Sequence, residues 1–110
     1  MTGTTVRLCG RDEVAPCTAK RFDVDGHRIA LVRIDDGFYA IGDRCTHADI
    51  SLAEGEVLCE EREIECWKHG STFSLVTGEP QSLPATRATP TYEVVIDGDD
   101  VSVVIAGQKP

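Results

Sequence analysis

The sequence has few aromatic residues and no long apolar run. Three Phe, two Tyr and one Trp are its only aromatic residues, and no stretch approaches the roughly 20 apolar residues that a membrane helix needs. Residues 1–5 do not show the basic segment followed by an apolar segment that is typical of a secretory signal. We therefore expect a cytoplasmic protein that has no membrane partner.

Basic residues are also scarce. Eleven Lys and Arg face nineteen Asp and Glu, a formal net charge of −8, which disfavours nucleic acids and anionic membranes as partners. Solubility is the simplest role for most of this charge. One acidic stretch could also steer the domain to a positively charged partner protein; it contains Glu54, Glu56, Glu60, Glu61, Glu63 and Glu65.

The usual signatures of substrate chemistry are missing. The sequence has no Ser/His/Asp set, no phosphate-binding glycine loop and no dinucleotide fingerprint. Its 110 residues are enough for one small domain with a core, residues 1–110, and too few for a second cofactor domain. These absences predict that the chain is not an enzyme.

Three Asp-Gly pairs divide much of the chain into short apolar segments. Asp25-Gly26, Asp36-Gly37 and Asp97-Gly98 each separate two stretches rich in β-branched or aromatic residues. Asp-Gly suits tight hairpins, because glycine accepts a positive φ freely and aspartate tolerates one. The pattern predicts an antiparallel, all-β domain, with at most one helical turn at residues 11–14.

Two short motifs indicate a metal centre. Cys45-Thr46-His47 and Cys66-Trp67-Lys68-His69 each offer one sulfur and one nitrogen ligand, in the same order, with eighteen residues between the motifs. A [2Fe–2S] cluster with mixed ligation needs two Cys on one iron and two His on the other. A Cys2His2 zinc site uses the same four ligands, but its first pair is typically separated by two to four residues and not by one. The spacing favours the cluster, and zinc remains the alternative.

These motifs and their surroundings resemble the Rieske ferredoxin family over about residues 6–105. The similar segments are Phe38-Tyr39-Ala40-Ile41, Asp43-Arg44-Cys45, Ser51-Leu52-Ala53-Glu54-Gly55-Glu56, Phe73-Ser74-Leu75-Val76-Thr77-Gly78 and Pro84-Ala85. The resemblance implies an antiparallel β-sandwich or barrel base, at about residues 5–42 and 86–106. A smaller cluster-binding subdomain would be inserted at about residues 43–85, with Ile64-Glu65-Cys66 and residues 72–76 as its strands.

The resemblance also implies the ligand set of one Rieske [2Fe–2S] cluster. Cys45 and Cys66 would bind one iron, and His47 and His69 would bind the other and form the exit for electrons. Three further residues are expected around the cluster. Ser71 would donate to a cluster sulfur or stabilise its turn; Trp67 would pack under the loop, shield the cluster or contact a partner; and Pro84, with Pro80, would stiffen a covering loop or an ordinary turn.

The ligand types and two departures from the family bear on the reduction potential. Neutral imidazoles remove negative charge from the core, so Rieske centres lie at about −150 to +300 mV, above plant-type ferredoxins. High-potential members carry an extra cysteine in each ligand loop, where this chain has Ile50 and Lys68, and often a tyrosine where it has Phe73. We therefore expect a potential in the low-to-middle part of the Rieske range.

The resulting prediction is a one-electron carrier, with a flavin-dependent reductase as donor and an oxygenase component as acceptor. His27, expected at the surface of a hairpin, cannot by itself complete the two-His, one-carboxylate iron site of a catalytic oxygenase subunit. Three alternatives are an accessory ferredoxin in iron–sulfur assembly or sulfur metabolism, a redox sensor, and a zinc-stabilised interaction module.

Three cysteines lie outside the ligand motifs. In a reducing compartment Cys9, Cys17 and Cys59 are most simply free thiols with buried or half-buried side chains. A redox-sensing thiol and a Cys9–Cys17 disulfide are the alternatives.

Overall fold

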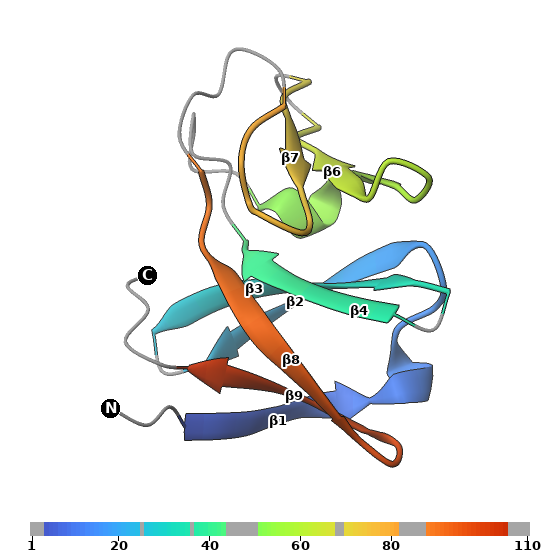
Figure 1. Cartoon of the computed structure of the whole chain (residues 1–110), viewed down its shortest axis with the longest axis vertical. Coiled ribbons are helices and arrows are strands. Elements are labelled where there is room, and N and C mark those ends of the chain that lie inside the picture. Colours follow the sequence, from blue (N-terminus) through green and yellow to red (C-terminus); the bar gives the residue numbers. More distant parts are fainter. Residues whose placement is uncertain are drawn as a thin grey trace.

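The computed structural model describes residues 4–24, 26–35, 37–43, 51–67, 70–81 and 88–105. The described chain is nearly all β, which confirms the predicted fold class. Its strands form two antiparallel sheets, one above the other in Figure 1. No helix in this part of the chain is long and apolar enough to cross a membrane.

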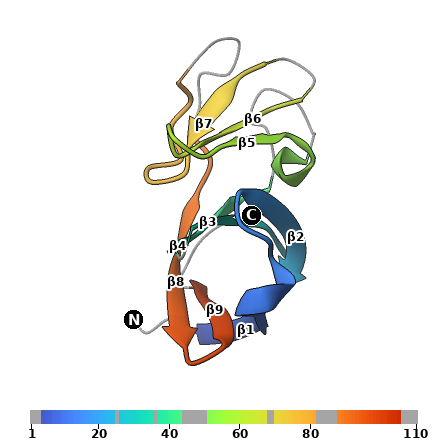
Figure 2. The ribbon, with the colours of Figure 1, turned by 90° about the vertical axis from the view of Figure 1, so that its right-hand side faces the viewer.

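The larger sheet, called here the base sheet, has six strands in the order β1-β9-β8-β4-β3-β2. It curls around its own interior, as Figure 2 shows. Hairpins join β2 to β3, β3 to β4 and β8 to β9, whereas β1 pairs with β9 and β4 pairs with β8 across the intervening residues. The strands are β1 (Thr4–Gly10), β2 (Thr18–Val24), β3 (His27–Ile34), β4 (Gly37–Gly42), β8 (Thr91–Asp97) and β9 (Asp100–Ile105).

The three Asp-Gly pairs lie at the junctions of paired strands of this sheet, with Gly37 as the first residue of β4 and Asp97 as the last residue of β8. The first separates β2 from β3, the second β3 from β4, and the third β8 from β9. Before β2, residues Arg11–Glu13 form the short helical turn η1, as the sequence predicted.

The smaller sheet, called here the small sheet, has strands of only three residues. β5 (Glu56–Leu58), β6 (Glu63–Glu65) and β7 (Thr72–Ser74) pair in that order, after a turn of 3-10 helix, η2 (Leu52–Glu54). The sequence predicted strands near β6 and β7 but missed β5, because the charged and mixed residues around Val57 give no alternating pattern.

Two buried clusters hold the molecule together. One lies inside the base sheet and includes Ile29, Leu31, Val101 and Val103. The other lies between the two sheets: Ala30, Val32 and Ile41 of the base sheet pack with Leu52, Ile64, Cys66, Phe73 and Leu75. Alternate residues of β3 therefore serve different cores, which explains why this strand is apolar without interruption from Ile29 to Val32.

The chain leaves and re-enters the base sheet at one place. The amide of Gly42 donates to the carbonyl of Pro90 at 2.7 Å, and the Thr89 hydroxyl donates to the carbonyl of Gly42 at 3.1 Å. The amide of Thr89 in turn donates to the carbonyl of Gly78 at 2.8 Å. The two backbone connections to the small sheet thus run side by side at the end of β4.

Two cysteine expectations were wrong. Cys17 and Cys59 form a disulfide across 42 positions of sequence, whereas free thiols or a Cys9–Cys17 bond had been expected. Cys9 is free and buried, and its burial raises its pKa. Spacing in sequence gave no sign of the pair, because the two sheets bring Cys17 and Cys59 together. A cross-link over this separation stabilises a fold by about 4 kcal/mol, mainly by restricting the unfolded chain.

The expectation for His27 was also wrong. Its side chain is buried, and its ring nitrogen Nδ1 lies 3.0 Å from the hydroxyl of Tyr92. The two rings also meet edge to face. His27 is therefore part of the base sheet's packing, on the strand next to β4.

Candidate metal centre

One of the four expected ligands belongs to the described residues. Cys66 follows β6 directly, is free and is fully buried in the core between the sheets. Cys45, His47 and His69 lie outside the described residues. The geometry available for the site is therefore that of Cys66 and of the anchors on both sides of each ligand loop.

The second ligand loop is closed tightly at its base. The amide of Cys66 donates to the carbonyl of Ser71 at 2.7 Å, and the amide of Gly70 donates back to the carbonyl of Cys66 at 2.9 Å. β6 and β7 continue from these two ends and pair with each other, Glu65 facing Thr72. Cys66 is consequently held from both directions by backbone hydrogen bonds.

The approach to Cys66 is equally close-packed on its other side. A Cβ on Gly55, where η2 ends, would collide with the carbonyl oxygen of Glu65, the residue before Cys66. Only glycine permits this approach of the two backbones. The conformation around the ligand is therefore set by main-chain contacts and not by long side chains.

The first ligand loop is anchored by Asp43, a role that the sequence analysis missed. Asp43 ends the described chain before this loop, and its fully buried carboxylate accepts from the Ser51 hydroxyl at 2.5 Å and from the Ala53 amide at 2.7 Å. Its two acceptor bonds join the two ends of the loop. Arg21 of β2 adds a guanidinium 3.6 Å from the same carboxylate. The sequence held two signals for this anchoring role: Asp43 stands two residues before Cys45, and Ser51 follows the first ligand motif.

Two of the three residues expected near the cluster are described. Ser71 is fully buried at the end of its loop, so its side chain faces the protein and not bulk water. Trp67, in contrast, is 53% exposed, which contradicts the expectation that it packs under the loop. Pro84 lies outside the described residues, and Pro80 forms a bridge to Phe73 of β7.

The acidic stretch surrounds the small sheet. Glu54, Glu56, Glu60 and Glu61 are exposed, and Glu63 and Glu65 are half-buried. They come from η2, β5, β6 and the turn between β5 and β6, so the small sheet carries a largely negative surface, with Glu60 and Glu61 in the turn that precedes β6 and Cys66 after the far end of that strand.

The residues present fit a two-iron cluster. The donor set expected from the sequence is two thiols and two imidazoles in two separate motifs, and the described residues beside each motif are anchored, by Asp43 and by the Cys66–Ser71 bond. Mixed thiolate and imidazole ligation of this kind is the ligation of a Rieske [2Fe–2S] centre. The buried environment of Cys66 also limits solvent access to a sulfur ligand.

Known proteins share this fold. The Rieske [2Fe-2S] domain family matches residues 4–93. The ferredoxin component of biphenyl 2,3-dioxygenase from Rhodococcus jostii is 34% identical over 101 residues, which cover 92% of both chains. The ferredoxin of carbazole 1,9a-dioxygenase from Nocardioides aromaticivorans superimposes with a TM-score of 0.90, at 38% identity, over 94% of this chain and 99% of its own.

A third similarity comes from an assembled complex. A chain in a structure of reduced oxygenase with oxidised ferredoxin, from carbazole 1,9a-dioxygenase, matches with a TM-score of 0.84 and 35% identity. The match covers 91% of this chain and 92% of that chain.

The anchored Cys/His loops and the two-sheet fold define an iron–sulfur protein of the ferredoxin type. This chain belongs to the Rieske [2Fe-2S] domain family. Its cofactor is a Rieske-type [2Fe–2S] cluster, so the zinc alternative is set aside.

Proposed function

We propose that this chain is the one-electron carrier of a multicomponent dioxygenase and not its catalytic component. A flavin-dependent reductase would supply the electron, and an oxygenase component would accept it, in the cytoplasm. The observation that carries the proposal is the family match, together with relatives of the same length that are ferredoxin components of dioxygenases. When bound, the cluster supplies reversible one-electron chemistry.

For the ligands we propose Cys45 and Cys66 on one iron and His47 and His69 on the other. Cys66 supports this assignment, because it is a buried free thiol whose loop is closed by backbone bonds. Asp43 would keep the first loop in register with the second, since it holds both ends of the first loop. We also propose that the Ser71 hydroxyl donates to a cluster sulfur and that Pro84 belongs to a loop that covers the cluster.

A matched pair of histidine variants tests the ligand proposal. His69→Cys should replace a neutral ligand by a thiolate, lower the reduction potential and abolish the Rieske spectrum. His27→Gln is the control, because His27 contacts Tyr92 in the base sheet; it should keep the spectrum. An unchanged spectrum in His69→Cys would contradict the assignment.

The potential is proposed to lie low to middle in the Rieske range. Phe73, which stands where high-potential members often have a tyrosine, is fully buried and pairs with Ile64 of β6. A phenyl ring there offers no hydroxyl to stabilise added negative charge. Ile50 and Lys68 similarly leave no disulfide between the ligand loops.

The surface around the ligand loop supports docking of a basic partner. Trp67 is an exposed aromatic side chain beside Cys66, and tryptophan is enriched among residues that dominate binding energy. The exposed glutamates of the small sheet would attract a positively charged surface to the same part of the molecule. We propose that the oxygenase component contacts Trp67 and that these glutamates speed the encounter.

Electron delivery can be measured directly. Cluster-loaded protein, reduced with dithionite without oxygen, is mixed with the oxidised oxygenase component of a biphenyl-type dioxygenase, and re-oxidation is followed by visible absorption. We expect re-oxidation that slows as salt is added. The Glu60→Gln/Glu61→Gln double variant should slow association several-fold at low salt. Asp99→Asn, in the β8–β9 turn, is the matched control and should change nothing. Complete failure to transfer electrons would contradict the proposed acceptor.

A further inference from the structure

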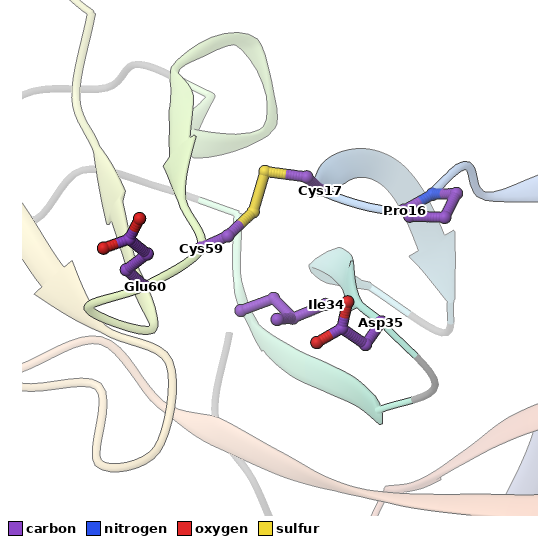
Figure 3. A pocket seen from close by; sticks show the side chains of 6 residues that line it. All are labelled: Pro16, Cys17, Ile34, Asp35, Cys59 and Glu60. Carbon is purple, nitrogen blue, oxygen red and sulfur yellow. A yellow bond between two sulfur atoms is a disulfide. The ribbon is translucent and has the colours of Figure 1, made fainter.

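The Cys17–Cys59 disulfide joins the two sheets at a point that the cluster function does not explain. Cys17 immediately precedes β2 of the base sheet, and Cys59 immediately follows β5 of the small sheet. Figure 3 shows the bond spanning from one ribbon to the other above the end of β3. Neither cysteine belongs to the proposed ligand set.

This covalent link lies at the opposite end of the base sheet from the two backbone connections. The amide of Cys17 donates to the carbonyl of Arg33 at 2.7 Å, and Arg33 pairs with Phe38 near the start of β4. The backbone connections lie at the other end of β4, at Gly42. From Phe38 to Gly42 the strand spans about 13–14 Å. The chain therefore attaches the small sheet on one side, and the disulfide attaches it on the other.

The disulfide is accessible to a thiol reagent. Cys17 is exposed and Cys59 half-buried. Both border a cavity of about 290 Å³ whose other walls are exposed residues and one half-buried side chain, Ile34 (Figure 3). Its lining residues are Pro16, Cys17, Ile34, Asp35, Cys59 and Glu60.

Cys59 is also coupled to the cluster-binding strands. It begins the turn that leads to β6 and to Cys66, and the amide of Arg62 in this turn donates to its carbonyl at 3.3 Å. The amide of Leu75, after β7, donates to the carbonyl of Arg62 at 2.9 Å. A change in the restraint on Cys59 therefore reaches all three strands of the small sheet.

We propose that Cys17–Cys59 is a second, two-electron redox site, reduced by a dithiol and re-formed by a disulfide of the same class. It fastens the small sheet to the base sheet and slows cluster loss. The buried core between the sheets keeps the reduced protein folded, so the site adjusts cluster retention without dismantling the fold.

The exchange balances without any electron from the cluster. A thiolate of the dithiol attacks Sγ of the exposed Cys17, forms a mixed disulfide and releases the Cys59 thiolate, which takes up a proton. The second thiol of the reagent then loses its proton and attacks the reagent's first sulfur, which is bonded to Cys17. This step closes the reagent's disulfide and releases the Cys17 thiolate, which takes up a proton. Two protein thiols form, and the dithiol becomes a disulfide.

The test begins with the thiols of the full chain. Of the five cysteines, the pair removes two from the count, so denatured, cluster-free protein should show three reactive thiols before and five after dithiothreitol treatment. Peptide mapping should find Cys17 linked to Cys59. A thiol count that returns from five to three after treatment with oxidised dithiothreitol supports a reversible site. Five thiols in protein purified without reductant would overturn the proposal. A linkage that dithiothreitol leaves intact in the folded protein would also overturn it.

The second measurement is the rate at which an iron chelator bleaches the cluster. Dithiothreitol should speed bleaching of the wild-type protein at least about threefold and raise hydrogen exchange in β5 and β6. Cys17→Ser should start at the faster rate and show no further response, which separates the disulfide from direct effects of dithiothreitol. Cys9→Ala, which removes the buried free thiol, should respond as the wild type does.

Equal bleaching rates with and without the bond would overturn the coupling. Because the proposal does not depend on the electron acceptor, its failure leaves a normal Rieske spectrum and normal electron delivery. Failure of the carrier function would conversely leave the thiol count and hydrogen exchange unchanged.

Discussion

The base sheet and the small sheet are both antiparallel, but they are held in shape by different means. Strands of six to eight residues form the base sheet, and each hairpin is continued by regular pairing. Strands of three residues form the small sheet, where single contacts support the short pairing: the Asp43 carboxylate, the Cys66–Ser71 bond and the packing of Gly55 on Glu65. The base sheet therefore tolerates local change, while the small sheet depends on individual residues.

This difference fits the separate roles of the two sheets, since the small sheet lies beside the proposed ligand loops and the base sheet contains most of the described strands. A sheet that carries two ligand loops has to fix their relative positions, because ligands must be held within a fraction of an ångström of their working geometry. The anchors in the small sheet all lie within two or three residues of a proposed ligand loop. The following substitutions compare the two sheets pairwise, from the largest expected effect to the smallest.

Two glycines with positive φ give the largest contrast. A Cβ at Gly78 would collide with the backbone carbonyl of Thr89, whereas a Cβ at Gly98, in the β8–β9 turn, meets nothing nearby. Gly78→Ala should destabilise the protein by about 4 kcal/mol or more, and Gly98→Ala by about 1 kcal/mol, the cost of its backbone conformation alone. Denaturant unfolding measures both; equal losses would contradict the contrast.

Two fully buried isoleucines compare the cores. Ile64→Ala, in β6, and Ile29→Ala, in β3, should each cost about 2–5 kcal/mol through lost burial and an unfilled cavity. Only Ile64→Ala should also reduce the cluster content of the purified protein, because Ile64 supports the strand before Cys66. Iron analysis decides this point, and equal iron in the two variants would contradict a specific role of Ile64 in holding the strand before Cys66.

Asp43 and Asp23 both lie near Arg21, and they allow a buried anchoring carboxylate to be compared with an exposed one. Asp43→Asn should cost about 1–3 kcal/mol and broaden the cluster's spectrum, since the buried carboxylate accepts two hydrogen bonds across the first loop. Asp23→Asn removes only the exposed ion pair, 3.2 Å from Arg21, and should cost less than about 0.5 kcal/mol. Unfolding free energies and absorption spectra check the pair. A normal spectrum for Asp43→Asn would argue against its anchoring role.

The smallest effect concerns pH in the base sheet. Burial raises the pKa of Tyr92 above its ordinary value of about 10. Its contribution to stability is therefore full below pH 10 and is lost as the pH rises through the folded-state pKa. Tyr92→Phe should flatten this alkaline decline in thermal unfolding while the cluster spectrum at neutral pH stays normal. An equally steep decline in the variant would assign it to other groups.

The sequence predicted the base sheet better than the small one, for a physical reason. Asp-Gly turns and β-branched runs are local signals, and they located the hairpins from β2 to β4 and from β8 to β9. The small sheet is held by contacts between residues distant in sequence, such as Gly55 with Glu65 and Cys17 with Cys59, and no local pattern encodes them. The motif predicts Cys66 as a ligand, and this stays a prediction; the burial of His27 and the exposure of Trp67 depend on packing, and the sequence analysis favoured the opposite for both.

The most direct test of the central claim is one set of spectra with metal analysis on a single sample. The protein is purified in air, its visible spectrum recorded, and its paramagnetic resonance spectrum measured after dithionite reduction, with iron, sulfide and zinc quantified. A Rieske centre predicts a brown protein with about two iron and two sulfide ions per chain and a low average g value on reduction. A colourless protein with one zinc and no sulfide would contradict it.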